Sequence, residues 1–383
     1  MIEIISKETL FTYNLYHITK AFFPEEEIRQ CVDGEQEPLV KLTVDGGSCF
    51  SVAEEPQIGE DVQPEVFRQM RKRFVTHKVY GYLSERTGRK LAWGMLTGVR
   101  PTKLVMQKLE SGKSEEEIVE FLKEEYSVSD EKAKLAIEIA EREKRQMECL
   151  HTPEGFSLYV GIPFCPSICS YCSFSSSPAD QWQDQMDSYL DALCREIRAT
   201  AKMAKGKILD TVYIGGGTPT TLSAGQLDRL LLCIEQNFSM ETVQEYTVEA
   251  NVESLDEDKM KLLKRYGVNR ISLGVQTLQP VLLSIIGRRH TREEVVERIR
   301  QLHQYGIHNI SIDLIYGLPQ QTMKMWQDDL QDIVQHFQIS HISLYALTIE
   351  EHSQFGRDGV ENIDADVETD MYLYAVSYLK KHG

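Results

Sequence analysis

A strand followed by a helix, repeated six times after residue 155, is the feature that most constrains how this chain can fold. The predicted strands are short, apolar on both faces and rich in β-branched or aromatic residues, and they cover residues 156–162, 210–216, 245–251, 269–275, 309–317 and 341–347. Strands with this pattern are typical of buried parallel sheets. Amphipathic helical segments follow them, so the sequence predicts a parallel sheet with right-handed crossover helices.

The number of units decides which α/β architecture is expected. A closed barrel of this type has eight strand–helix units, whereas this sequence has six. We therefore predict an open, partial (β/α)6 barrel over residues 156–383, with an open doubly wound sheet as the alternative. In barrel-like α/β folds the carboxyl ends of the strands carry the chemistry. The unusual polar residues of this chain lie at those ends.

Residues 1–150 do not show this alternation of strands and helices, and we predict that they form a separate, helix-rich domain. Residues 62–83 have helical periodicity, and Ser114 and Glu117 have the spacing of a capping box at the start of another helix. Residues 39–47 have the pattern of a strand that enters a turn. None of these features assigns the domain a role.

Charge and composition exclude several classes of function. The chain has 42 basic and 59 acidic residues, a net charge of −17, which argues against a nucleic-acid-binding protein. No apolar run is long enough for a membrane span and the first residues lack a signal-peptide pattern, so we expect a cytoplasmic protein. A disulfide framework is not expected for its eight cysteines.

Three of the cysteines, Cys165, Cys169 and Cys172, lie within eight residues, directly after the first predicted strand. A loop with this spacing can wrap three thiolates around one metal centre. A four-iron cluster ordinarily takes four cysteines, so three would leave one iron open to an outside ligand. The alternatives are a zinc ion completed by a distant residue such as His151, or buried cysteines that bind no metal.

Further candidate residues follow the later strands. The glycines of GGGTPT, residues 215–220, allow backbone N–H groups to approach an anionic ligand, although a tight strand-to-helix turn would use the same residues. Glu249, Gln276 and Asp313 each end a predicted strand. There they can bind hydroxyl or amino groups of a ligand, and the alternative is that they cap the next helix.

Arg288 and Arg289 precede a predicted helix. A surface arginine pair in this position is usually solvated. Arginine can also bind a carboxylate through two parallel hydrogen bonds, and in so acidic a chain this second interpretation gains weight.

In combination, these motifs resemble the radical S-adenosylmethionine (SAM) enzymes. CPSICSYC resembles their cluster loop, and GGGTPT resembles their methionine-binding turn. The order of these motifs, followed by VEAN, SLGVQT and IDLIYGLPQQT, resembles the branch around oxygen-independent coproporphyrinogen III oxidase. The resemblance covers residues 156–383. It implies one [4Fe-4S] cluster, held by Cys165, Cys169 and Cys172, whose open iron binds the amino and carboxylate groups of SAM.

The resemblance also implies which residues contact SAM, position by position. Tyr159, Gly216 and Glu249 match the residues that contact the cluster-bound molecule. Another set matches positions that hold a second SAM in the coproporphyrinogen oxidases, and its members are Tyr171, Gly217, Thr218, Gln276, Arg288 and Asp313. We therefore expect one bound SAM, or two.

The activity implied by the resemblance is the oxidative decarboxylation of coproporphyrinogen III to protoporphyrinogen IX in haem biosynthesis, without oxygen. The region before residue 150 supports it, because this region, especially residues 91–104 (LAWGMLTGVRPTKL), resembles the extra N-terminal unit of a coproporphyrinogen dehydrogenase subgroup. Phe174 departs from the pattern, because the oxidases usually carry a further cysteine there. A phenylalanine at this position is similar to the related haem chaperones, which bind haem. A haem chaperone is therefore the alternative function.

The partners implied are a small-molecule substrate, either a porphyrinogen or haem, and an electron donor such as flavodoxin or a reductase. We expect a monomer that binds no nucleic acid. Family members continue beyond the position of Gly383 with another strand and a C-terminal domain that covers the barrel mouth. That extension is expected to be missing from this sequence.

Overall fold

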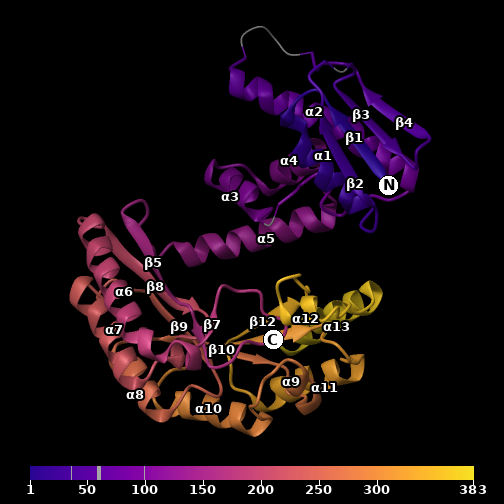
Figure 1. Cartoon of the computed structure of the whole chain (residues 1–383). Helices are drawn as coiled ribbons and strands as arrows, with labels where there is room; N and C mark the ends of the chain where they lie inside the picture. The colour runs from indigo at the N-terminus through magenta and orange to yellow at the C-terminus, as the bar shows by residue number, and fades with distance from the viewer. Residues whose placement is uncertain (36, 58–61, 99) are drawn as a thin grey trace. The chain divides into compact units, whose positions relative to one another are not determined.

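The computed structural model describes residues 1–35, 37–57, 62–98 and 100–383 and divides the chain into two units, Met1–Glu148 and Cys149–Gly383 (Figure 1). Val99, which belongs to the segment LAWGMLTGVRPTKL, lies outside the described residues. Among the described helices, none is both long enough and apolar enough to cross a membrane.

The N-terminal unit begins with a four-stranded sheet in the order β2-β1-β3-β4. Its strands are β1 (Ile2–Ser6), β2 (Ile28–Val32), β3 (Val40–Val44) and β4 (Ser48–Val52), and its helices are α1 (Thr9–Phe22) and α2 (Pro64–Thr87). Strand β1 pairs in parallel with β2 and antiparallel with β3. Alternate apolar residues of β1 and β3, among them Ile4 and Leu42, pack with residues of α1 and α2 in one core.

Of these four strands, the sequence predicts only β3, within a helix-rich unit. The other three strands are found in the structure. Strand β2 escapes sequence-based prediction because most of its side chains are exposed, so it lacks the alternating pattern of a half-buried strand. The helical prediction is confirmed in the rest of the unit, where the helices are α3 (Thr102–Glu110), α4 (Glu115–Tyr126) and α5 (Asp130–Met147). The capping box of α4 is present, with hydrogen bonds between Ser114 and Glu117 in both directions.

The C-terminal unit confirms the predicted α/β fold class. Its sheet has the order β12-β11-β10-β9-β8-β5, and every neighbouring pair is parallel. The strands are β5 (Gly155–Ile162), β8 (Ile208–Gly216), β9 (Glu245–Asn251), β10 (Arg270–Gln276), β11 (Asn309–Tyr316) and β12 (His341–Ala346). Since the first and last strands do not pair with each other, the sheet is open, as a partial barrel requires.

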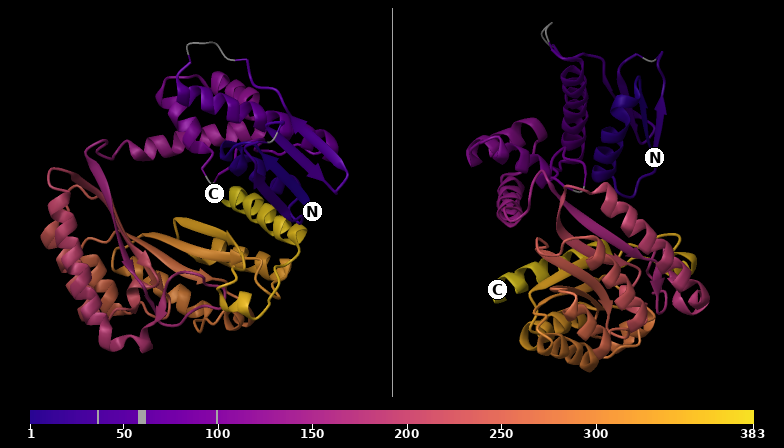
Figure 2. Two further views of the ribbon diagram at one scale, coloured as in Figure 1. Left: turned by 45° about the horizontal axis from the view of Figure 1, so that its top comes forward. Right: turned by 90° about the vertical axis from the view of Figure 1, so that its left-hand side faces the viewer.

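Helices cover the outer face of this curved sheet (Figure 2). They are α6 (Gln183–Met203), α7 (Ala224–Asn237), α8 (Glu257–Arg265), α10 (Arg292–Gln304), α11 (Met323–His336) and α13 (Ala365–His382). Two short helices, α9 (Pro280–Ile285) and α12 (Gln354–Arg357), belong to a separate apolar cluster near the carboxyl ends of the strands. The main core contains apolar side chains from the strands and the longer helices, such as Ile214, Leu230 and Leu273. Because side chains alternate along a strand, the other face of the same strands is free to present polar groups.

Helix α13 is attached to this layer through Trp326 of α11. The Trp326 side chain is fully buried, and its indole Nε1–H donates to the main-chain oxygen of Met371 at 2.9 Å. The last helix of the chain is therefore held by both apolar packing and a buried hydrogen bond.

Replacing Trp326 with alanine should lower the free energy of unfolding of the C-terminal unit by roughly 3–5 kcal/mol, because a large cavity forms between α11 and α13. Urea denaturation followed by circular dichroism measures this change. Trp182→Ala is the matched control, because Trp182 is exposed and its loss should change stability by less than about 1 kcal/mol. Equal effects of the two substitutions would contradict this account of the core.

Candidate functional site

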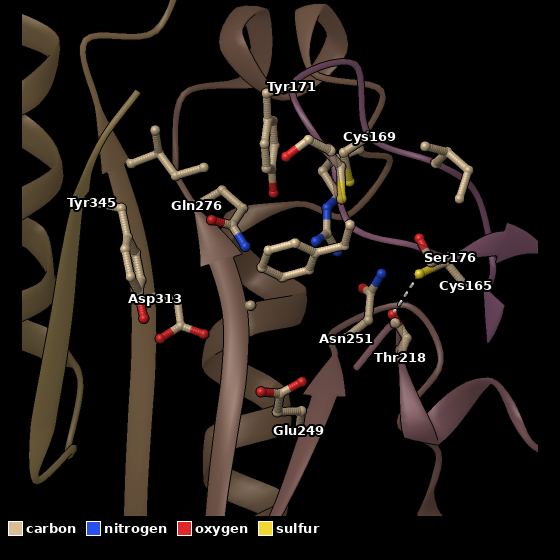
Figure 3. Close-up of a pocket in the computed structure, with 18 of the residues that line it drawn as sticks. Cys165, Cys169, Tyr171, Ser176, Thr218, Glu249, Asn251, Gln276, Asp313 and Tyr345 are labelled. Atoms are coloured by element: carbon tan, nitrogen blue, oxygen red, sulfur yellow. Dashed lines mark hydrogen bonds between the residues drawn. The ribbon is translucent and has the colours of Figure 1, made fainter. Parts of the chain in front are cut away.

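A cavity of about 450 Å³ lies at the carboxyl ends of the strands of the C-terminal unit (Figure 3). This volume is within the range of small-molecule sites. The cavity brings together the predicted site residues Cys165, Cys169, Cys172, Tyr171, Gly216, Gly217, Thr218, Glu249, Gln276, Arg288 and Asp313. Tyr159 is the exception, since it is not among the described residues that line the cavity.

The loop that carries the three cysteines is closed at its base by main-chain pairing. Phe164–Cys165 (β6) pairs with Ser177–Pro178 (β7), and the N–H of Ser177 donates to the carbonyl oxygen of Pro163 at 2.8 Å. Both ends of the loop are therefore fixed next to the end of β5. The thiols of the loop face the cavity from one short segment.

Ser170, between two of the predicted site residues, fixes the tip of this loop. Its N–H and its hydroxyl donate to the carbonyl oxygens of Ile286 and Ile285 at the end of α9, both at 3.2 Å. Its own carbonyl oxygen accepts from the N–H of Phe355 at 2.9 Å. The sequence contains no signal for this role, because the partners lie more than a hundred residues away.

The glycine-rich turn after β8 contacts the cysteine loop directly. The N–H of Gly217 donates to Ile162, and the N–H of Thr218 donates to Phe164, each at 2.7 Å. The Thr218 hydroxyl lies 3.5 Å from the thiol of Cys165, the contact dashed in Figure 3. A Cβ atom on Gly217 would lie 2.7 Å from the Phe164 oxygen and 3.0 Å from the Cys165 sulfur. Only glycine permits this approach.

The arrangement of the thiols bears on which metal group fits here. Among the described residues, no three His, Cys, Asp or Glu side chains converge closely enough to hold a single metal ion. A cluster binds each thiolate through a different iron, so three thiols that line one cavity can each bind one iron of a cluster. The zinc alternative completed by His151 is wrong. His151 precedes β5, at the end opposite the cysteines, and its Nδ1 lies 2.6 Å from Asp210.

Two carboxylates of the cavity, Glu249 and Asp313, come from the strands β9 and β11 (Figure 3). Burial raises the pKa of Glu249, although hydrogen bonds from the hydroxyl of Tyr213 at 2.6 Å and the N–H of Gly216 at 3.2 Å act in the opposite direction. Burial also raises the pKa of Asp313, which accepts a hydrogen bond from Ser272 at 3.4 Å. Buried carboxylates that keep their charge need a cationic or hydrogen-bonding partner.

The alternative that these carboxylates cap the following helices is wrong. The side chain that caps α8 is Asp256, and the one that caps α11 is Thr322. Glu249 and Asp313 are therefore available to bind a ligand that enters the cavity.

Gln276 reaches the cavity from a strained position at the end of β10. Its φ of 71° lies in the left-handed region, and the pairing of β10 with β11 shifts register next to it. The residues that follow Gln276 are held by Asp329 of α11. This buried carboxylate accepts hydrogen bonds from Thr277 and Gln279, each at 2.6 Å, and from the N–H of Leu278 at 3.1 Å. The packed helix thus fixes the backbone that orients Gln276.

Arg288 and Arg289 differ in their surroundings. Arg289 is exposed, whereas Arg288 lines the cavity. The Nε and Nη1 atoms of Arg288 are buried and have no hydrogen-bond partner among the described residues. A buried guanidinium with unpaired donors requires an anionic or carbonyl group to satisfy it. Carboxylate binding, rather than a solvated pair, therefore fits Arg288.

Several cavity residues were not predicted as site residues. Asn251 and Tyr345 each lie at or near the end of a strand, so the strand-end rule could have identified them. The remaining ones lie mostly on loops, where periodicity gives no signal, and they include Ser167, Ser173, Ser176, Thr348 and Glu350. Phe174 also lines the cavity, and 71% of its surface is exposed.

Comparisons with known proteins identify a known domain in the part of the chain that carries this site. Residues 159–333 match the model of the radical SAM superfamily. The oxygen-independent coproporphyrinogen-III oxidase-like protein HemZ of Bacillus subtilis is 33% identical over 84% of this chain and 65% of its own length. The haem chaperone HemW of Lactococcus lactis is 41% identical over 59% of this chain and 59% of its own length.

One solved structure that is similar to this chain is that of coproporphyrinogen III oxidase (HemN) from Escherichia coli, which is described as a radical SAM enzyme. It has a TM-score of 0.57 and 26% identity, and the match covers 63% of this chain and 56% of that chain. This chain therefore spans less than two thirds of the length of each of these relatives. The predicted fold and the predicted superfamily are both confirmed.

Gly217→Ala should reduce the iron and sulfide bound after anaerobic reconstitution by more than half, because the added methyl group would displace the cysteine loop. Metal analysis of the purified protein measures this loss. Gly225→Ala is the matched control, since a Cβ at Gly225 in α7 meets nothing within 4 Å. Normal iron content in the Gly217 variant would contradict the close contact between loop and turn.

Proposed function

Because the chain carries a radical SAM domain, we propose that it catalyses the oxygen-independent oxidative decarboxylation of coproporphyrinogen III to protoporphyrinogen IX. One observation carries the proposal. Three cysteine thiols, a glycine-rich turn and the unpaired guanidinium nitrogens of Arg288 face a single cavity. Similarity to HemZ, which extends over most of this chain, supports the same activity.

The superfamily implies a [4Fe-4S] cluster and SAM, and the residues of the cavity fit both groups. Cys165, Cys169 and Cys172 would hold the cluster, which leaves one iron without a cysteine ligand. When bound, the cluster and SAM supply one-electron chemistry that can remove a hydrogen atom from an unactivated carbon. The contacts between the cysteine loop and the glycine-rich turn would hold the thiols in place for this chemistry.

Within the cavity, several charged and polar residues have roles that their surroundings support. Glu249, whose carboxylate accepts two hydrogen bonds, would bind the amino group of SAM. Arg288 would bind a carboxylate, either a propionate of the substrate or that of a second SAM, because its Nε and Nη1 atoms have no partner in the described residues. Gln276 and Asp313 would bind hydroxyl or amino groups from neighbouring strands.

The chemistry of the substrate is consistent with these groups. Each propionate that becomes a vinyl group loses carbon dioxide and one hydrogen atom, and releases one electron. The reaction therefore needs an electron donor to start the chemistry and an acceptor for the released electron. A flavodoxin-like protein or a reductase would serve as the donor.

A haem chaperone is the second candidate function, and Phe174 favours it. This residue stands where the oxidases usually carry a further cysteine, and its ring is largely exposed at the cavity. An exposed aromatic ring can stack on a planar macrocycle. The 41% identity to HemW, over a shorter part of this chain than the match to HemZ, also supports this candidate.

One anaerobic assay separates the two candidates. Full-length protein with a reconstituted cluster is incubated with SAM, dithionite and coproporphyrinogen III, and the products are identified by mass spectrometry. We expect the successive loss of two carboxyl groups as carbon dioxide. Cys172→Ala should abolish these losses, whereas Cys31→Ala, which removes an exposed cysteine of the N-terminal unit, should not.

No decarboxylation, together with tight stoichiometric binding of haem, would overturn the enzyme in favour of the chaperone. Absence of both activities in protein that contains its full complement of iron would contradict both candidates.

A further inference from the structure

We infer that Tyr213 is a positioning residue of the SAM site and acts through Glu249. Tyr213 is on β8 and is not among the described residues that line the cavity, whereas Glu249 of the neighbouring strand β9 is. The Tyr213 hydroxyl donates to Oε1 of Glu249 at 2.6 Å, and the N–H of Gly216 donates to Oε2 at 3.2 Å. Each carboxylate oxygen thus has its own donor from β8.

The neighbouring glycine makes room for this pair. A Cβ atom on Gly215 would lie 2.8 Å from the Glu249 carboxyl carbon and 2.8 Å from the Tyr213 ring. Real Cβ atoms do not approach other atoms so closely, so a larger residue would separate the hydroxyl from the carboxylate. Gly215 is therefore required by the contact between Tyr213 and Glu249, in addition to any approach of a ligand to the turn.

Tyr159 fixes the ring of Tyr213 from the other side. The two residues are paired directly across β5 and β8, and their rings are nearly parallel, with centroids 5.8 Å apart and planes at 13°. Although 62% of its surface is exposed, Tyr159 has this defined contact. It would therefore support Glu249 through Tyr213 even where it does not touch the cavity.

The charges around Glu249 explain why the hydrogen bond from Tyr213 affects the protonation of this carboxylate. Burial raises its pKa, and the charge of Asp313 on β11 raises it further. The bonds from Tyr213 and Gly216 lower it and so favour the ionised carboxylate. Burial and the bond to Glu249 raise the pKa of Tyr213 far above its usual value, so the hydroxyl remains a donor at neutral pH. Arg270 of β10 lowers the pKa of both Tyr213 and Asp313 by its positive charge, and His341 of β12 also lowers the pKa of Asp313.

An ionised Glu249 is the form that accepts hydrogen bonds most strongly from the amino group of SAM. Without the Tyr213 hydroxyl, the pKa of Glu249 rises, and a larger fraction of the carboxyl is protonated at a given pH. Loss of the hydroxyl should therefore weaken binding of SAM most at low pH. The inference rests on the proposed binding of SAM, but it does not depend on which tetrapyrrole is the substrate.

The test is equilibrium binding of SAM to reconstituted full-length protein, by anaerobic calorimetry from mildly acidic to mildly alkaline pH. Tyr213→Phe keeps the ring and its stacking on Tyr159. It should weaken binding about tenfold at neutral pH, since a hydrogen bond to a charged group is lost. The pH below which affinity falls should move upward relative to wild type.

Two comparisons separate positioning from a general effect on folding. Tyr246→Phe is the matched control, because this buried hydroxyl on β9 has no hydrogen-bond partner among the described residues, and it should leave affinity and pH profile unchanged. In a Glu249→Gln background, Tyr213→Phe should add little further loss, because the two residues act as one unit.

Wild-type affinity with a wild-type pH profile in Tyr213→Phe would overturn the inference, as would an equal loss in Tyr246→Phe. Failure of the wild-type protein itself to bind SAM would instead overturn the proposed function, and this inference with it. The two failures are thus distinguishable in a single set of titrations.

Discussion

The contact between the cysteine loop and the glycine-rich turn is the constraint on which the rest of the site depends. The two segments follow neighbouring strands, β5 and β8, and they are joined by hydrogen bonds between main-chain atoms. Gly217 allows the turn to approach Cys165 to a distance that no side chain would permit. The position of the thiols is thus set by backbone geometry, which is more rigid than contacts between long side chains.

Other elements of the C-terminal unit then fix what surrounds the loop. Ser170 attaches its tip to α9 and to the segment after β12. Asp329 of α11 holds the turn after β10, from which Gln276 reaches the cavity. In both cases residues outside the cavity bind a segment that carries cavity residues. A site made in this way keeps its geometry without a ligand, as preorganised binding sites require.

Much of the fold could be predicted because the residue pattern that indicates each strand or helix lies within that strand or helix. Six short apolar strands separated by amphipathic helices admit few arrangements, and the carboxyl ends of parallel strands necessarily meet at one edge. Cys165 and Glu249 follow from that rule, whereas Asp313 reaches the same cavity from the middle of β11. The contacts of Ser170 and Asp329 could not be predicted, because each joins residues far apart in sequence through ordinary polar side chains. In the N-terminal sheet, β2 could not be predicted because it is mostly exposed and carries no alternating pattern.

The central claim is that three cysteines hold a cluster whose remaining iron binds SAM directly. Pulsed electron–nuclear double resonance on the reduced, reconstituted full-length protein tests it, with SAM labelled by nitrogen-15 at the amino group. The account predicts a hyperfine coupling between the cluster and the labelled nitrogen, and its loss when SAM is omitted. A reduced cluster with no such coupling at saturating SAM would contradict it.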